Sequence, residues 1–402
     1  MKDAMTFWLD RGVAGFRVDA VPFLFEVTSL QDEPLSNDPK ALPDDYLYLI
    51  HNYTVNLEET FDMVQQWRGL IEARQEPKRL MMAEAYADFE TTLRYYGTPQ
   101  SPGAHFPFNF AHITDVNGNS TPADFLKATK KWIDDLPPGA LSNWVIGNHD
   151  NHRVASRFGR ELVDGLNMLA LLLPGVAVTY NGEEIGMEDT SVSWEQTKDP
   201  QALDAGPERY LQYTRDPERT PFQWDDTTSA GFSNSEVTWL PVNSNYPELN
   251  VEAQKKASVS HYHVYKLLTA ARATPTIQRG DTQVEVIGDH VFAFTRSVKL
   301  RRLQDSDTYV ILMNLGAEEE IVDLLATFSP LADKVMVYAA SVHSGVAHGL
   351  VYGERDALDR ATTETGDITI EGSVRLYACI VYKYDSTFCG GRMVLCVILV
   401  LD

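Results

Sequence analysis

Three short apolar runs, each followed by a segment of helical character, limit this chain to a few possible folds. They lie near residues 13–18, 80–86 and 142–147, and further runs lie near 105–110 and 176–181. Strands that alternate with helices are typical of parallel βα units, whose ligand sites lie at the carboxyl ends of the strands. The first three runs carry a carboxylate near that end: Asp19, Glu84 and Asp150. The sequence therefore predicts three carboxylates converging on one face.

The first of these carboxylates has a charged neighbour. Arg17 and Asp19 lie on the same face of the predicted strand by period-2 alternation, which is costly in a buried strand unless the two residues pair or serve chemistry. Taken alone, each acidic residue has an ordinary interpretation, because an Asp at a strand end most often forms a turn or caps a helix. Their ordered occurrence along one chain favours a catalytic site.

Four motifs around these residues resemble those of a known family. The segments GFRVDA (15–20), MAEAYAD (82–88) and GNHDNHRVASR (147–157) resemble signature regions of the α-amylase superfamily of glycoside hydrolases. The segment RDPERTPFQWD (215–225) resembles a loop motif of the insect maltase branch, whose members are α-glucosidases. The resemblance covers the chain from Phe7 to about Tyr384.

The resemblance implies roles for the three carboxylates. It makes Asp19 the nucleophile, Glu84 the acid/base, and Asp150 a ligand for sugar hydroxyls that stabilises the transition state. A retaining glycosidase needs two carboxyl groups roughly 5 to 5.5 Å apart. We expect Arg17 to keep Asp19 ionised, and the neighbouring anions Asp19 and Asp150 to favour the protonated form of Glu84.

The resemblance also indicates substrate-binding residues. His149 matches a histidine that donates to a sugar hydroxyl, and Arg153 matches an arginine that closes the non-reducing end of the pocket. Four aromatic residues could stack on sugars: Phe106, Phe108, Phe110 and Tyr180. Aromatic residues on strands are more often part of the core, so only Phe108 is predicted to contact substrate. His152 is interpreted as a solvated loop histidine, because His149 already fills the motif position.

The fold that the resemblance implies is α/β. Residues 1–275 are expected to form the C-terminal part, strands four to eight, of a (β/α)8 TIM barrel, with a long loop at 188–250 that is typical of a functional lid. Apolar residues at helical spacing predict one helix over about 252–273. Strand-like runs over 280–385 predict a small antiparallel β-sandwich domain, followed by a tail over 386–402. The first three barrel strands are expected to be missing, so we expect an N-terminally truncated chain with impaired activity.

The composition limits the classes of molecule that this chain is expected to bind. With 57 acidic and 34 basic residues, the net charge of −23 disfavours nucleic acid and anionic membranes and fits a neutral sugar. Nothing in the sequence indicates a cofactor, a metal-ligand set, a disulfide framework or an oligomeric state. Asn52 and Asn119 are candidate N-glycosylation sites if the chain enters the secretory route. The alternative for the second segment is a helix start, with Thr121 as cap and Pro122 at the first helical position.

The function that these observations favour is hydrolysis of maltose, sucrose and short α-1,4-linked oligosaccharides with retention of configuration. The small Ala20 after the predicted nucleophile favours α-1,4 over α-1,6 linkages in the resembling family. The alternative is a non-catalytic surface receptor or transporter-subunit-like relative. The resemblance implies a secreted or extracellular protein, and the Gly-Gly pair followed by the apolar run 393–401 leaves open a lipid anchor, a buried strand or a non-native tail.

Overall fold

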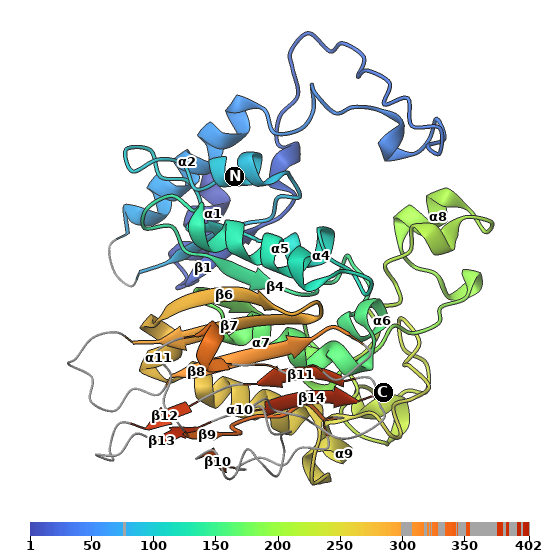
Figure 1. Ribbon diagram of the computed structural model, residues 1–402. Coiled ribbons are helices and arrows are strands. Elements are labelled where there is room, and N and C mark those ends of the chain that lie inside the picture. Colours follow the sequence, from blue (N-terminus) through green and yellow to red (C-terminus); the bar gives the residue numbers. More distant parts are fainter. Residues whose placement is uncertain are drawn as a thin grey trace. The chain divides into compact units, whose positions relative to one another are not determined.

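The computed structural model describes residues 1–74, 78–298 and 308–316, and then shorter stretches, of which some are described by their backbone alone: 320, 322, 324–328, 334–342, 344, 351–353, 376–380, 383–385, 392–394 and 397–401. The chain divides into two compact units (Figure 1). Unit 1 comprises Met1–Asn109 and Asp135–Asn143, and unit 2 comprises Phe110–Asp134 and Trp144–Asp402. This division does not follow the expected boundary between 275 and 280, which stays a prediction.

Unit 1 is built on a parallel sheet of order β1-β2-β3. Its strands are β1 (Gly15–Val18), β2 (Leu80–Ala83) and β3 (Phe106–Pro107). A Cβ on Gly15 would lie 2.4 Å from the carbonyl oxygen of Leu80, so the close approach of these strands requires glycine there. The third strand is shorter than the run at 105–110 suggests, since Pro107 has no N–H to extend the ladder.

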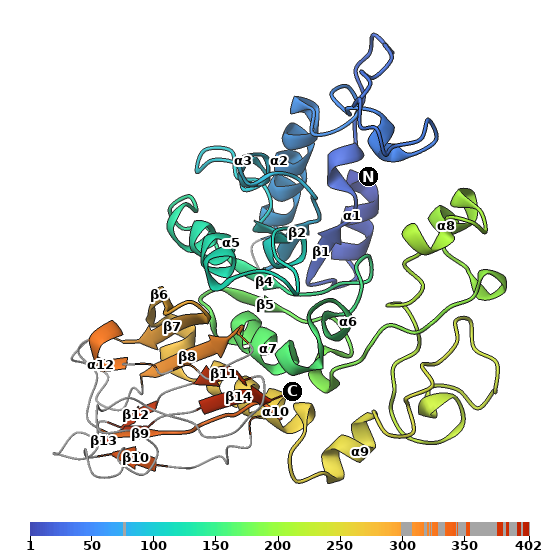
Figure 2. The ribbon, with the colours of Figure 1, turned by 45° about the vertical axis from the view of Figure 1, so that its right-hand side comes forward.

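Helices α1 (Lys2–Leu9), α2 (Glu58–Glu72) and α3 (Phe89–Arg94) complete unit 1, with 3-10 turns at Val21–Phe23 and Tyr46–Tyr48. Helix α2 packs on β2 and against α1 (Figure 2). It buries four large side chains at helical spacing, Phe61, Val64, Trp67 and Ile71. Helix α3 begins at Asp88, whose side chain accepts a hydrogen bond from the Thr91 N–H. These helices cover the sheet and leave the carboxyl ends of the strands to carry the site.

Unit 2 holds the next strands and most of the helices. Strand β4 (Asn143–Val145), whose first residue belongs to unit 1, pairs with β5 (Val176–Val178). Helix α7 (Val163–Leu172) is buried at every residue and packs against α10 (His261–Arg272). It is apolar except for Asp164, which is hydrogen-bonded to His261, and Asn167, which donates to the Glu183 carbonyl. The other helices are α4 (Ala111–Thr114), α5 (Pro122–Asp134), α6 (Val154–Phe158), α8 (Pro200–Ala205), α9 (Val251–Lys256) and α11 (Pro275–Arg279).

Two helix predictions can be compared with unit 2. Helix α5 begins at Pro122 as expected, and Thr121 and Asp124 cap it reciprocally through the Thr121 N–H and the Asp124 N–H. The single helix expected over 252–273 is wrong, because the chain forms α9 and α10 with a break between them. Ser260 caps the second helix by accepting a hydrogen bond from the His263 N–H, which starts a new helix in a new direction.

The C-terminal part of unit 2 is antiparallel, as the strand pattern predicts. Strands β6 (Asp281–Ile287), β7 (Val291–Ser297) and β8 (Tyr309–Asn314) form one sheet in that order. Three two-stranded pairs follow: β9 (Lys334–Met336) with β10 (Val351–Gly353), β11 (Leu376–Ile380) with β14 (Val397–Leu401), and β12 (Lys383–Asp385) with β13 (Arg392–Val394). A short helix, α12 (Leu324–Thr327), lies between β8 and β9 in the chain. That these strands form a sandwich stays a prediction.

The tail supplies one strand to each of two pairs: β13 pairs with β12, and β14 pairs with β11. This pairing favours the strand interpretation of the apolar run in the tail. The Gly-Gly pair, Cys389 and Cys396 lie outside the described residues, and the lipid anchor stays a prediction. Within the described part of the chain, no helix combines the length and the apolar character needed to cross a bilayer.

Candidate active site

Unit 1 brings Arg17, Asp19 and Glu84 together at the carboxyl ends of two adjacent parallel strands. Arg17 Nη1 donates to Asp19 Oδ1 at 2.5 Å, and Arg17 Nη2 donates to Glu84 Oε2. The backbone fixes the same corner, because the Glu84 N–H donates to the Val18 carbonyl at 2.9 Å and the Val21 N–H donates to the Glu84 carbonyl at 3.2 Å. The guanidinium therefore bridges two carboxylates that are 65 residues apart in sequence.

The two carboxylates differ in burial. The Asp19 side chain is 71% exposed and that of Glu84 is 10% exposed, with Arg17 between them at 36%. An exposed carboxylate beside a largely buried one gives two environments within one site, which is the arrangement that lets two acids take different roles. The sequence predicted the Arg17–Asp19 pair; the second bond, to Glu84, was missed because it depends on how β1 and β2 are aligned.

The backbone turns sharply at Ala20, directly after Asp19. It has φ 48° and ψ 37°, in the left-handed region that non-glycine residues seldom adopt, and it precedes the 3-10 turn Val21–Phe23. A small side chain limits the steric cost of this conformation, which a β-branched residue would increase. The small residue that the sequence analysis linked to substrate preference thus also has a backbone reason to be small.

Unit 2 contains the third carboxylate, with two arginines that the sequence analysis did not name. Asp150 Oδ1 accepts hydrogen bonds from Arg215 Nη1 at 3.0 Å and from Arg219 Nη2 at 2.5 Å. Arg219 Nε also donates to the His149 carbonyl at 2.6 Å, and His149 Nε2 lies 3.4 Å from Asp150 Oδ2. The loop motif at 215–225 was the signal that could have identified these arginines.

The segment 188–250 is organised around this arginine cluster. Arg215 binds Asp199 in a bidentate manner, with Nε to Oδ2 at 2.8 Å and Nη2 to Oδ1 at 2.7 Å. The Asp199 side chain is fully buried, and its hydrogen bond raises the pKa of Arg215. The neighbouring Asp216 accepts the N–H groups of Lys198 and Asp199. A segment with little regular structure is therefore ordered by buried charge-assisted hydrogen bonds.

Arg153 lies inside unit 2 and is 3% exposed. Its Nη1 donates to the Asn181 carbonyl at 2.7 Å, its guanidinium carbon lies 5.1 Å from the centre of the Tyr180 ring, and burial lowers its pKa. A contact between Arg153 and substrate therefore stays a prediction.

Phe108 is no more exposed than the aromatics that were assigned to the core. It is 8% exposed, compared with 2% for Phe106 and 8% for Phe110, and its ring meets that of Phe106 edge-on. Its role as a sugar contact stays a prediction. The glycosylation candidates Asn52 and Asn119 are both exposed, and their modification likewise stays a prediction.

The carboxylates predicted from the sequence thus lie in two charged clusters, one in each unit. Arg17, Asp19 and Glu84 meet in unit 1, while His149 and Asp150 meet Arg215 and Arg219 in unit 2. Because Asp150 and Glu84 belong to different units, the convergence of all three carboxylates stays a prediction.

Comparison with known proteins supports one family. Maltase A1 of Drosophila melanogaster is 43% identical over 360 residues, which is 87% of this chain and 61% of the relative. The salivary alpha-glucosidase of Anopheles gambiae is 44% identical over 335 residues, covering 82% of this chain and 56% of the relative. The more distant amino acid transporter heavy chain SLC3A1 of Mus musculus is 32% identical over 348 residues, covering 84% of this chain and 48% of the relative.

A solved structure supports the fold. The alpha-glucosyl transfer enzyme XgtA matches with a TM-score of 0.71 at 24% identity, covering 87% of this chain and 64% of that protein. The chain thus spans about half to two thirds of the length of the proteins that it resembles. The family model for the alpha amylase catalytic domain matches residues 1–280. The chain therefore belongs to the α-amylase family, whose catalytic domain has the TIM-barrel fold.

Proposed function

We propose that this chain is an α-glucosidase that hydrolyses terminal α-1,4-linked glucose from maltose, sucrose and short oligosaccharides with retention of configuration. The observation that carries the proposal is the bridge from Arg17 to both Asp19 and Glu84 at the ends of β1 and β2. One guanidinium can bond two carboxylates only if they lie a few Å apart, which is compatible with the separation of roughly 5 to 5.5 Å of a retaining pair.

The proposed reaction has two steps. The Asp19 carboxylate attacks the anomeric carbon while protonated Glu84 gives its proton to the departing glycosidic oxygen, which leaves a glycosyl ester on Asp19. Glu84, now ionised, then takes a proton from water as the water oxygen attacks the same carbon, and the ester bond to Asp19 breaks.

The two clusters divide the work in this proposal. Asp19 is exposed and can reach a sugar, whereas Glu84 is largely buried beside it. Asp150 would bind sugar hydroxyls, with its carboxylate oriented by Arg215 and Arg219, and His149 would donate to a further hydroxyl. Phe108 and Arg153 are the remaining proposed substrate contacts.

The finer architecture is also a proposal. We place residues 1–275 as strands four to eight of the barrel, with 188–250 as a lid, and 280–385 as a β-sandwich. The name of the salivary relative supports secretion as the location of the chain.

The test is hydrolysis of p-nitrophenyl α-glucoside and maltose by the purified chain and by Asp19→Asn. Asp10→Asn is the matched control, because Asp10 is also exposed and also bonded to an arginine, Arg74. We expect Asp19→Asn to lose roughly 10⁴-fold in kcat and Asp10→Asn to keep its activity. With the p-nitrophenyl substrate, the glucose released by hydrolysis should initially be the α-anomer. A wild-type chain no more active than Asp19→Asn, or a β-anomer product, would contradict the proposal.

Substrate preference is tested separately. The small Ala20 supports a preference for maltose over isomaltose, and the reverse preference would refute it.

One alternative has its own support, since the similarity to the transporter heavy chain SLC3A1 fits a non-catalytic partner protein. That alternative predicts no difference between wild type and Asp19→Asn in any glucoside assay.

A further inference from the structure

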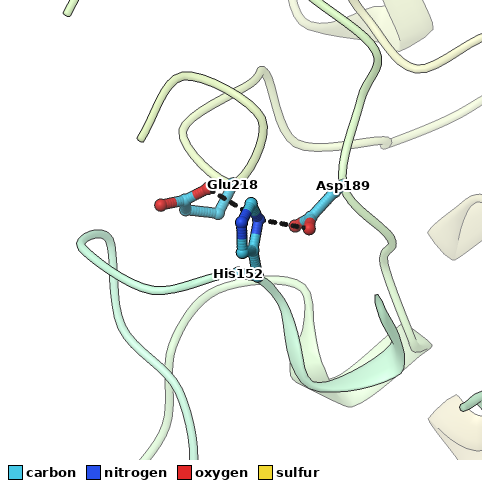
Figure 3. A group of neighbouring side chains, drawn as sticks. All are labelled: His152, Asp189 and Glu218. Carbon is cyan, nitrogen blue, oxygen red and sulfur yellow. Dashed lines mark ion pairs between the residues drawn. The ribbon is translucent and has the colours of Figure 1, made fainter. Parts of the chain in front are cut away.

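Three side chains of unit 2 meet at a point that the proposed hydrolysis does not use. His152 Nδ1 lies 2.7 Å from Asp189 Oδ2 and 3.7 Å from Glu218 Oε2, and the three donor atoms all lie within 4.8 Å of one another. Figure 3 shows the imidazole of His152 between the two carboxylates, which come from separate segments of the chain. From the sequence, His152 is expected to be a solvated loop histidine, but the fold gives it two acidic partners.

The Asp189 carboxylate is held in place by its surroundings. Its Oδ1 accepts the Arg153 N–H at 2.8 Å, while its own N–H donates to Ser156 Oγ at 2.9 Å and its carbonyl accepts from Asn243 Nδ2 at 3.0 Å. These bonds fix the orientation of the side chain, so that Oδ2 is directed at His152. Such outer contacts are what positions ligands in metal sites.

Glu218 supplies the second observation. Its side chain is 1% exposed, and its Oε2, the oxygen that faces His152, accepts no hydrogen bond. Burial raises its pKa to about 7. The segment around it is fixed, because the Tyr180 hydroxyl donates to the Glu218 carbonyl at 2.9 Å and the Thr190 N–H donates to the Pro217 carbonyl at 3.0 Å. Buried carboxylate oxygens normally accept a hydrogen bond or bind an ion. Glu218 Oε2 accepts no hydrogen bond, and it faces His152.

We propose that His152 Nδ1, Asp189 Oδ2 and Glu218 Oε2 bind one divalent transition-metal ion of the zinc type. An imidazole nitrogen with two carboxylates favours such an ion over Mg²⁺ or Ca²⁺, which prefer all-oxygen ligands. Zn²⁺ lies about 2.0 to 2.2 Å from N and O ligands, so small side-chain movements bring all three donors onto it. The His152 side chain is 54% exposed, which gives the ion a route from solvent and room for a water ligand.

Binding exchanges protons for the metal. The proton shared between His152 and Asp189 and any proton on Glu218 leave to solvent as the ligands take up the ion. The proposal does not depend on the glycosidase activity, because none of the three residues has a role in that reaction.

The test is zinc binding to the purified chain at pH 7.5, measured by equilibrium dialysis, with Co²⁺ absorption as a second readout. Glu218→Gln keeps the shape of the buried side chain and removes its charge, and His152→Ala removes the nitrogen ligand. His290→Ala is the matched control, because His290 is similarly exposed, at 49%, but has a single carboxylate 3.9 Å away, on Glu320.

We expect one saturable zinc site in the wild type and in His290→Ala. The zinc affinity of Glu218→Gln and of His152→Ala should be at least 10-fold lower. The visible Co²⁺ bands should disappear in the same two variants. Circular dichroism identifies a variant that has failed to fold, and the remaining variant then decides. Equal zinc affinity in the wild type and both folded variants, or no saturable site in the wild type, would overturn the proposal and leave His152 as an ion-pair partner only.

Discussion

The carboxylates of the two units are bound by arginine in different ways. In unit 1, a single guanidinium serves Asp19 and Glu84, and Asp19 remains 71% exposed. In unit 2, two guanidinium groups bond Asp150, which is 21% exposed, and Arg215 is itself anchored to the fully buried Asp199. Exposed ion pairs contribute little to stability, whereas buried charge-assisted bonds are costly to break. We therefore expect the bonds of Arg17 to matter mainly for chemistry and the bond from Arg215 to buried Asp199 to matter mainly for stability.

After Asp19→Asn, the largest effect should follow from Glu84→Gln. Gln cannot donate a carboxyl proton or take one from water, so kcat/KM for maltose should fall roughly 10³- to 10⁴-fold. With an activated aryl glucoside, added azide should restore turnover and yield α-glucosyl azide. Glu72→Gln is the control, because Glu72 also pairs with an arginine, Arg68, and is 50% exposed. Unchanged maltose hydrolysis in Glu84→Gln would show that the unit 1 cluster is not the chemical one.

Arg17→Lys should have the next largest effect. The ammonium keeps the charge but cannot bond both carboxylates with a planar fork, so we expect kcat to fall roughly 10²-fold with little change in the urea midpoint. If Arg17→Lys instead lowers stability and leaves kcat unchanged, the contrast between the clusters is reversed.

Arg215→Lys tests the structural side of the comparison. It removes the bidentate bond to buried Asp199, so the free energy of unfolding should fall by about 2 to 3 kcal/mol and proteolysis within 188–250 should accelerate. Arg160→Lys is the matched control, because Arg160 also binds a carboxylate in a bidentate manner, Glu188, at 2.6 Å for both bonds, but its side chain is 59% exposed. We expect less than about 1 kcal/mol there. Equal losses in both variants would mean that burial of Asp199 contributes nothing.

The smallest expected effect is the change of stability with pH. We compare His112, a buried histidine of unit 2, with His105, a histidine of unit 1. Burial lowers the pKa of His112 to about 4 from 6.5, so between these values the unfolded chain binds more protons than the folded one. Stability should therefore fall as the pH falls through this window, by about 2 kcal/mol between pH 7 and pH 5. In urea unfolding, His112→Gln should remove this loss.

The control for the pH experiment is His105→Gln. Burial also lowers the pKa of His105, but its Nδ1 accepts the Met81 N–H and the residue is only half-buried. Its removal should change the acid sensitivity less than that of His112. The opposite order would show that burial in unit 2 does not govern the titration.

Local patterns made part of this molecule predictable. The helix start at Thr121-Pro122, the antiparallel strands after residue 280 and the Arg17–Asp19 pair follow from capping, alternation and two-residue spacing, and each is present. The break between α9 and α10 was missed, although Ser260 is a good cap, because the apolar spacing on either side reads as one helix. The family was predictable because its motifs are short, ordered and local.

The family, the acidic side chains at the strand ends and the antiparallel character of the C-terminal region could all be predicted from the amino-acid sequence. Only the tertiary structure decided their partners: the bond from Arg17 to Glu84, the two arginines on Asp150, and the placement of His152 between Asp189 and Glu218. The physical reason is range. Capping and alternation act over a few residues, whereas these contacts join residues that are 37 to 69 positions apart along the chain and come together only when strands pair and the 188–250 segment packs.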